Sequence, residues 1–589
     1  MDKAAIYHRP ASEMAYMTDN DHYQLQLKTK HQDIARVRVI YGPPQTLMTH
    51  EGKLVSWEYE TSEMHLRLQN GVYDVWSIEL PIPKMRKLKY AFHLLDKNGD
   101  EVLYDANLSQ KYTPKALERV TGFVTAYLGY DENATVPKWV QKMVWYRLMP
   151  DRFANNDKKR DPKDILEWGA EADKAKFFGG DLQGIIDNLD YIQSLGINGL
   201  YLTPIFDAYS NHKFDTIDYY EIDPEFGTKE KFKELVEALH QRGMKLMLDV
   251  TCDHLSDFSL QWQDVRKYGA RSSFAKWFLI EQFPVRYVPT ESPDYAERLT
   301  YEALNNNPHM PKVDLENPEV QEYFGNILTY WTRNFGIDAW SIADSNEIPT
   351  SFKLYLSERL KKVAPEIYLL GNTVANKAEQ DQVFAGTNAI NVRDLIEQTF
   401  IERTIAPTEL AYALNEHQLR ARPTELFASL LAADSPKTAR ILAKCDDNVQ
   451  LLRAVIAFMF MQPETPSILY GTEKGLLAGT EAALQPCMDW KETEKSSEMQ
   501  RFIKKLIAAR AKYGDVLTVG SFEWGPCSNQ HAYLSFSRNL GEKKIFAIFN
   551  LGYGSIKIVL PKNSKLLLGQ NLVEQDQRLG QYGFAIIAL

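Results

Sequence analysis

Acidic and imidazole side chains follow several apolar segments of the sequence. Asp249 lies near the end of one such segment and His254 comes five residues later, while Asp344 follows residues 337–343 and Asp434 follows 426–432. A carboxylate can attack an electrophilic carbon or exchange a proton with a reacting group, and an imidazole can exchange protons or hydrogen-bond a ligand. These groups can act together only if the fold brings the segment ends to one place.

Apolar strands alternate with amphipathic helices from residue 126 to residue 515, a pattern typical of β/α units around a parallel sheet. Helices are predicted at 182–195, 229–242 and 320–334. Eight strands are predicted, at residues 143–149, 197–204, 244–250, 337–343, 366–372, 382–388, 426–432 and 466–471. The predicted fold is therefore α/β, a TIM (β/α)8 barrel, whose C-terminal strand ends would carry the site.

The segments on either side of the barrel have a different pattern. Residues 1–125 contain short alternating strands and turn residues, which predict an N-terminal β-sandwich. Residues 516–589 return to strands and predict a C-terminal β-sandwich. The stretch 251–317 is too long for a plain loop, so we expect an inserted subdomain after strand three.

Motifs at the predicted strand ends resemble glycoside hydrolase family 13, the α-amylase family, in particular its neopullulanases, cyclomaltodextrinases and maltogenic amylases. The motifs are Phe178-Gly179-Gly180-Asp181-Leu182-Gln183-Gly184-Ile185, Leu202-Thr203-Pro204-Ile205-Phe206, Ser210-Asn211-His212-Lys213-Phe214-Asp215-Thr216 and Met310-Pro311-Lys312. The resemblance covers nearly the whole chain and implies the same three domains, with the N-terminal one used in dimerisation. It also implies retaining hydrolysis, which needs two carboxyl groups about 5 to 5.5 Å apart.

The resemblance places other residue types where the family has its catalytic groups. The family pattern G-x-D-x-W-R-x-D-x-x-N-E matches residues 336–347 without a gap, so the nucleophilic aspartate is replaced by Ala343 and the arginine by Ser341. The general acid at the end of strand five is replaced by Asn372. A methyl group cannot attack a carbon, and an amide cannot donate a proton as a carboxylic acid does.

The third family carboxylate belongs to an S-H-D-T pattern, and the corresponding segment here is two residues longer. Depending on the alignment, the aspartate position is taken by Ser435, Lys437 or Asp434. The histidine of the pattern is absent in each alignment. Asp344 directly follows Ala343, but neighbouring strand residues face opposite ways, so its carboxylate is expected to point away from the pocket.

Five residues are predicted to bind sugar, because an aromatic face and hydrogen-bonding groups together suit a pyranose ring. They are Tyr219, Asp249, His254, His212 and Asn372. The other interpretation is that these residues only maintain the inherited packing of the fold.

The resemblance also implies a possible calcium site after strand one. Its oxygen ligands would come from Asn155, Asp157, Asp161, Gly179 and Asp181. Arg160 stands at another ligand position, and its positive charge opposes metal binding. The alternative is a solvated charged loop without metal or other cofactor.

Three functions are compatible with these observations. The missing carboxylates favour a catalytically inactive member that binds α-glucans, maltodextrins or a protein partner. The second is an active hydrolase of cyclomaltodextrins, pullulan or maltodextrins with displaced carboxylates, such as Asp344, Asp434 or Glu347. The third is a regulatory subunit of an active paralogue.

Charge and composition restrict the partners. The formal net charge of the 589 residues is -10, with acidic and basic residues mixed along the chain, which argues against a nucleic-acid or membrane partner. The first residues lack the apolar core of a signal peptide, so a cytoplasmic location is expected. The expected assembly is a homodimer through the N-terminal domain, or a heteromer with an active paralogue.

Overall fold

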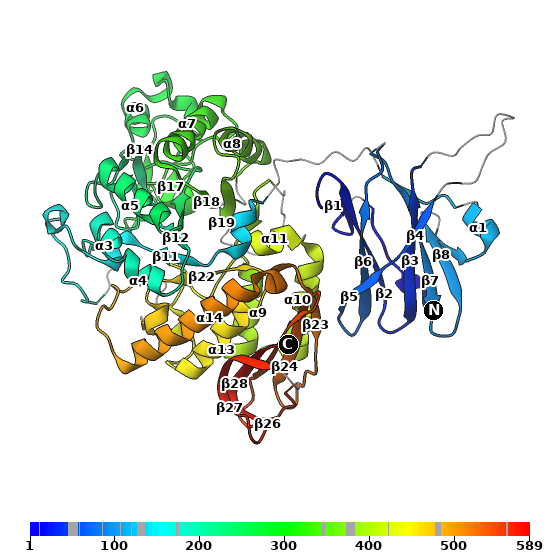
Figure 1. Ribbon diagram of the computed structural model, residues 1–589. Helices are drawn as coiled ribbons and strands as arrows, with labels where there is room; N and C mark the ends of the chain where they lie inside the picture. Colours follow the sequence, from blue (N-terminus) through cyan, green and yellow to red (C-terminus); the bar gives the residue numbers. More distant parts are fainter. Residues whose placement is uncertain are drawn as a thin grey trace.

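The chain forms an N-terminal domain, a central barrel with a protruding subdomain, and a C-terminal domain (Figure 1). The structure is a computed structural model, and it describes residues 1–589 except 11, 45–56, 58, 85, 106–107, 119, 126–135, 172–175, 344, 346–347, 373–382, 422, 478–484 and 561–563. None of the helices in these described ranges combines the length and apolarity needed to cross a bilayer.

The N-terminal domain is built from two antiparallel sheets. One has the order β1-β2-β6-β5, with bounds Ala15–Met17, His22–Lys30, Tyr73–Pro81 and His65–Gln69. The other has the order β4-β3-β7-β8-β9, with β10 (Phe123–Val124) paired to β7, and the bounds Glu60–Glu63, Ile34–Gly42, Lys89–Asp96, Glu101–Asp105 and Leu108–Lys111. Alternate residues such as Leu25, Leu27, Val37 and Val39 are buried between the sheets, as period-two patterns require.

Eight parallel strands form the barrel, as predicted. Their order is β20-β19-β18-β15-β12-β11-β22-β21, and a parallel bridge between Asn388 and Leu430 joins the two ends. In chain order the bounds are β11 Trp145–Leu148, β12 Gly199–Leu202, β15 Lys245–Val250, β18 Ala339–Ala343, β19 Tyr368–Asn372, β20 Gly386–Thr387, β21 Leu430–Ala432 and β22 Thr465–Leu469. Each strand lies within its predicted segment or starts one residue before it.

The register of the strands decides which side chains face the barrel axis. Trp145, Tyr201, Met247 and Ala339 belong to one buried cluster inside the barrel. Because side chains alternate along a strand, the residues two positions further toward the C-terminal ends also face inward. Arg147, Asp249 and Ser341 occupy these inward-facing positions on β11, β15 and β18. Asn372 has the corresponding position on the neighbouring strand β19.

Amphipathic helices cover the outside of the barrel. In α7 (Pro318–Phe335), the side chain of Asn317 caps the first turn, and Gly336 ends the helix at φ +75°, a conformation that favours glycine. Trp331 on its inner face is fully buried and donates its indole N–H to the carbonyl of Tyr219 at 2.7 Å. α5 (Lys229–Gln241) is likewise capped by Thr228 and buries its apolar face.

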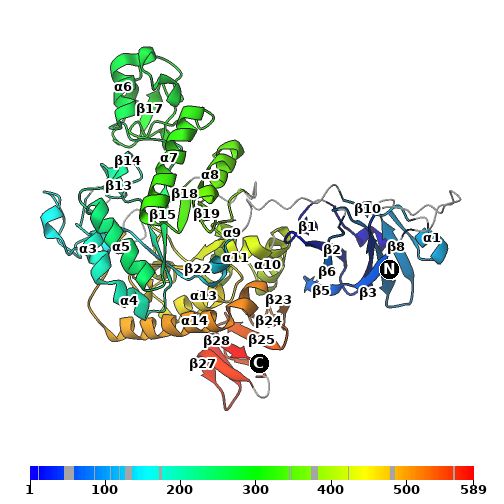
Figure 2. The same ribbon diagram turned by 45° about the horizontal axis from the view of Figure 1, so that its top comes forward.

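The predicted subdomain projects from the barrel beyond strand β15 (Figure 2). It contains α6 (Leu260–Tyr268) and the hairpin β16 (Tyr287–Pro289) with β17 (Ala296–Leu299). Its two connections to the barrel are paired with each other, since the Leu255 N–H donates to Pro311 and the Val313 N–H donates to Asp253. This pairing fixes the base of the subdomain beside the strand ends.

The C-terminal domain is an antiparallel sheet of β23 to β28, with bounds Ser521–Trp524, Tyr533–Leu540, Lys543–Asn550, Ile556–Lys557, Lys565–Val573 and Arg578–Ala588. One face packs on the barrel helices α13 (Val449–Phe460) and α14 (Glu494–Val519). The N-terminal domain contacts α10 (Pro407–Arg420) and β23, where Asn415 donates to the carbonyl of Gln69 at 2.9 Å.

Arg510 of α14 holds the end of α13. It is buried, and its two terminal nitrogens donate hydrogen bonds to the carbonyls of four consecutive or nearly consecutive residues, Phe460, Gln462, Pro463 and Glu464. Burial lowers the pKa of Arg510 to about 10, so it remains a cation at neutral pH.

We expect Arg510→Ala to destabilise the protein by about 3 kcal/mol or more, because buried carbonyls would lose their donors. Differential scanning calorimetry should show Tm lowered by at least about 3 °C. Lys505→Ala, which removes an exposed cation from the same helix, is the control and should leave Tm unchanged. An equal Tm for both variants would contradict this account.

Candidate functional site

Asp249 is the centre of a buried polar network at the barrel mouth. Its Oδ2 accepts from Arg147 Nη2 at 2.6 Å, and the two charges form an ion pair in which Asp249 is fully buried. Its Oδ1 accepts from the hydroxyls of Tyr201 at 2.9 Å and Ser341 at 2.6 Å, and from Asn372 Nδ2 at 3.3 Å. One carboxylate on β15 thus connects its own strand to four others, β11, β12, β18 and β19.

Arg147 supplies the cation of this network. Its guanidinium lies 4.3 Å from the centre of the Tyr201 ring as well as beside Asp249. The resemblance had placed the family's arginine at Ser341, and here that side chain is a small hydroxyl bonded to Tyr201 and Asp249. Burial raises the pKa of Tyr201 well above its usual value, so Tyr201 stays a neutral hydrogen-bond donor.

The positions of the family's nucleophile and acid lie side by side at this mouth. Ala343 pairs with Asn372 in the parallel register of β18 and β19, and both are buried. Asn388 donates to the Asn372 side-chain oxygen, while Asn372 Nδ2 reaches Tyr201 at 3.3 Å. Neither Ala343 nor Asn372 can serve as a carboxylate, so hydrolysis by this chain requires carboxylates at other positions.

Of the displaced candidates, Asp434 is described. It is buried, its Oδ2 accepts the backbone N–H of Ile441 at 3.0 Å, and Arg440 Nε lies 3.5 Å away. Asp344 and Glu347 lie outside the described residues.

The loop after Asp434 brings a cation to the mouth. Ser435 and Thr438 bond to each other and close a turn, and Lys437 on this turn is exposed, with its Nζ 4.8 Å from the centre of the Phe214 ring. The alignment left three residues open for the position of the third carboxylate. Of these, Lys437 is the one whose charged group lies beside Phe214, which belongs to another loop of the mouth.

His212 and His254 both lie near Phe214. His254 is fully buried, with one ring nitrogen 3.0 Å from the Phe214 carbonyl and the other 2.8 Å from Asp253. His212 is partly exposed, at 43 % of its side chain, and bonds Ser210 Oγ at 2.9 Å. His212 can reach a ligand directly, whereas His254 holds the backbone that carries Phe214.

Tyr219 does not have its predicted position at the surface of the mouth. Its ring is fully buried against Phe206 and Phe324, and its hydroxyl bonds Thr251 at 2.7 Å. Tyr219 is therefore a core residue of the barrel wall and cannot present an aromatic face to a sugar. The half-buried Phe214 is the aromatic ring that lies beside His212.

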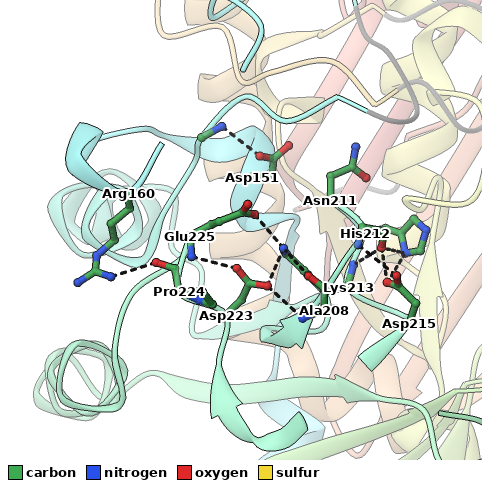
Figure 3. Close-up of polar contacts among 12 residues, drawn as sticks. Asp151, Arg160, Ala208, Asn211, His212, Lys213, Asp215, Asp223, Pro224 and Glu225 are labelled. Atoms are coloured by element: carbon green, nitrogen blue, oxygen red, sulfur yellow. Dashed lines mark hydrogen bonds and ion pairs between the residues drawn. The ribbon is translucent and has the colours of Figure 1, made fainter. Parts of the chain in front are cut away.

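A buried lysine holds this loop in place (Figure 3). Lys213 is fully buried at φ +59°, and its Nζ contacts Asp223 at 2.7 Å, Glu225 at 3.0 Å and the Ala208 carbonyl at 3.3 Å. Because Lys213 anchors the loop from below, its neighbours His212 and Phe214 are fixed at the mouth.

Sequence reasoning assigned no role to Arg147, Tyr201 and Phe214, and it considered Lys437 only as an alignment alternative for the third carboxylate. Arg147 could have been found from the sequence, because a charged residue two positions after Trp145 shares its face of a buried strand. The other three carry no such signal, since their role depends on which strands and loops are neighbours.

The predicted calcium ligands lie together, and several of them already have partners within the protein. Asp181 accepts backbone N–H groups from Asn156, Asp157 and Gly184. Asp157 pairs with Arg160 at 2.9 Å. Asn155 donates to Asp161 at 2.8 Å, and both lie against Gly179. In the described ranges no group of three or more His, Cys, Asp or Glu side chains is placed to hold a metal. The side-chain oxygen of Asn155 is buried without a hydrogen-bond partner, so calcium binding stays a prediction.

We expect Tm to be the same within about 1 °C in excess CaCl2 and in EDTA, because Arg160 already supplies the positive charge that faces Asp157. Differential scanning fluorimetry on the full chain measures this. A rise of Tm with calcium, enlarged by Arg160→Gly, would show that the ion binds.

Comparisons with known proteins agree with the fold and the order of the domains described above. Residues 147–362 match the family model "Alpha amylase, catalytic domain", and residues 1–128 match "Alpha amylase, N-terminal ig-like domain". The intracellular maltogenic amylase of Bacillus subtilis strain 168 is 37% identical over 94% of this chain and 92% of its own. A cyclomaltodextrinase of Geobacillus thermopakistaniensis is 32% identical over 100% of both chains. A solved cyclomaltodextrinase structure superposes with TM-score 0.86 at 27% identity, covering 100% of both chains.

These relatives contradict the prediction of a catalytically inactive glucan- or partner-binding protein. Proteins that match this chain along nearly their whole length are named for hydrolytic activities on α-glucans, and nothing in the comparisons indicates inactivity. The prediction of inactivity rested on Ala343, Ser341, Asn372 and the segment around Ser435, whereas the relationship extends over all three domains. With this identity and coverage, the chain belongs to the α-amylase family, glycoside hydrolase family 13, beside its cyclomaltodextrinases and maltogenic amylases.

Proposed function

We propose that this protein is an α-glucan hydrolase that acts on cyclomaltodextrins, pullulan or maltodextrins. The observation that carries the proposal is the 37% identity with an intracellular maltogenic amylase over 94% of the chain. Fold alone would not decide function, but here the relationship includes the strand ends, the subdomain beside them and both flanking domains.

The barrel mouth supports the proposal with groups that suit a neutral sugar. Asn372 can exchange hydrogen bonds with hydroxyl groups, His212 is partly exposed, and Phe214 offers an aromatic face. Behind them, Asp249 and Arg147 neutralise each other in a buried pair. The mouth therefore combines apolar and hydrogen-bonding surfaces around a rigid base.

The acting carboxylates are proposed to be displaced from the family positions. Asp344 and Glu347 follow β18 in the sequence. Asp434 follows β21, and its buried carboxylate accepts the Ile441 N–H beside Arg440, so an acting role for it requires a change of these contacts. Asp249 is proposed to be a positioning residue, because its buried carboxylate accepts hydrogen bonds from Arg147, Tyr201, Ser341 and Asn372.

Two further proposals accompany this function. The protein is a homodimer through its N-terminal domain, which lies beside the barrel and contacts α10 of the barrel and β23 of the C-terminal domain (Figure 1). It works in the cytoplasm, a proposal supported by a relative that is named intracellular.

The hydrolysis test uses β-cyclodextrin, pullulan and maltoheptaose with the purified full chain. We expect release of reducing sugar, and a loss of at least about 10³-fold in kcat from at least one of Asp344→Asn, Glu347→Gln and Asp434→Asn, since removing a reacting carboxylate abolishes its step. Asp164→Asn, at an exposed position in the loop after β11, is the control and should keep full activity.

If none of the three variants lowers the release of reducing sugar, the activity comes from a contaminant. If the unaltered chain releases no reducing sugar, the proposed function is contradicted. Asp249→Asn is measured in parallel, with circular dichroism to check folding. It should lower kcat and also lower Tm, because Arg147 would stay buried without the charge that orients and neutralises it.

The dimer is tested by multi-angle light scattering at micromolar concentration. The full chain should have twice the mass of one chain, and a variant that begins at residue 126 should be monomeric if circular dichroism shows that it folds. A monomeric full chain, or a folded truncated chain that still dimerises, would contradict dimerisation through the N-terminal domain.

A further inference from the structure

Two exposed aromatic rings lie against each other near the barrel mouth. Tyr209 is 73% exposed and Phe258 is 52% exposed, yet their ring centroids are 5.6 Å apart and the ring planes differ by only 24°. Large aromatic side chains are usually buried, so an exposed stacked pair has a hydration cost that a ligand would relieve. None of the predicted sugar-binding residues belongs to this pair.

Tyr209 belongs to the loop that Lys213 anchors, and hydrogen bonds hold the backbone of the residues on both sides of it. Before it, the Ala208 N–H donates to Asp223 at 3.1 Å and the Ala208 carbonyl accepts from Lys213. After it, the Ser210 N–H donates to Asp215 at 3.1 Å. The backbone of Tyr209 is thus fixed, which lowers the entropy cost of binding through its ring.

Phe258 is held by a second segment, at the point where the subdomain begins. The Phe258 N–H donates to Ser256 Oγ at 3.2 Å, and the Ser256 N–H donates to the Thr216 carbonyl at 3.0 Å. Two chain segments that are nearly 50 residues apart are therefore built to bring these rings together.

The surface continues with polar and aromatic groups on the subdomain. Asp257 bonds His309 at 2.8 Å, and the His309 side chain is 38% exposed. The ring of Tyr287, which is 42% exposed, lies 6.2 Å from that of His309. Hydrogen-bonding edges next to open ring faces suit a pyranose, whose ring faces are apolar and whose edge carries hydroxyls.

We propose that Tyr209 and Phe258 form an outer stacking subsite for a glucose unit of a long or cyclic α-glucan, away from the central network around Asp249. The ligand class rests on the proposed function. The pair consists of two rings flanked by polar groups. Its apolar surface is far smaller than the roughly 800 Å² that each partner buries in a stable protein interface, which favours a sugar as occupant.

The test is isothermal titration calorimetry of the full chain with maltose, maltoheptaose and β-cyclodextrin. We expect Tyr209→Ala and Phe258→Ala to raise Kd for maltoheptaose by about 3- to 10-fold, the effect of losing one aromatic contact. Maltose, which is short enough to occupy the central site alone, should keep its Kd. Tyr209→Phe keeps the ring and should bind as the unaltered chain does.

Two control variants separate stacking from other effects. Leu260→Ala removes an apolar side chain that is 72% exposed in the same region but cannot stack on a sugar. Tyr553→Ala removes a ring that is 77% exposed on the C-terminal domain. Both should keep the Kd for maltoheptaose.

An unchanged Kd in Tyr209→Ala and Phe258→Ala, or no binding of maltoheptaose by the unaltered chain, would overturn the subsite. If Leu260→Ala and Tyr209→Ala both lowered the measured dimer mass equally but left the Kd for maltoheptaose unchanged, the exposed rings would be a contact between proteins. That result would also overturn the sugar subsite. The proposed function can fail separately, because binding without hydrolysis would leave the subsite intact and remove only the catalytic step.

Discussion

The buried ion pair between Asp249 and Arg147 is the interaction on which the barrel mouth depends. Taking a carboxylate and a guanidinium out of water is favourable only when each finds its partner and further hydrogen bonds. Asp249 finds them in Tyr201, Ser341 and Asn372, which come from three other strands. The closed barrel makes this possible, because the parallel register brings inward-facing positions to one level.

This network also explains how the chain tolerates altered residues at the mouth. Ala343 and Asn372 lie at the ends of strands, above the apolar cluster that includes Trp145 and Met247, so they do not contribute to the interior core. Arg147 gives Asp249 a cation although Ser341 cannot. The fold is maintained by contacts spread over the whole chain, which is why relatedness along its length is compatible with the replacements predicted at Ala343, Ser341 and Asn372.

The region around the mouth has a different physical character from its base. Its loops are rigid because charged groups beneath them are paired, with Lys213 joined to Asp223 and Glu225. On these supports the chain presents rings and hydroxyls rather than further charged pairs. A rigid support under apolar and hydrogen-bonding groups is what a neutral, hydroxyl-rich ligand requires, since binding then orders few side chains.

The sequence by itself determined the domain architecture and the eight barrel strands, because the alternation of apolar strands and amphipathic helices follows directly from burial. It also predicted, from the resemblance, that Ala343, Ser341 and Asn372 replace the family's residues. Only the tertiary structure decided that Tyr219 lies in the core, that Arg147 pairs with Asp249, and that Tyr209 meets Phe258. A side chain's local pattern indicates that it is buried or exposed, but its partner comes from another segment, and the distance between segments is fixed only when the barrel closes.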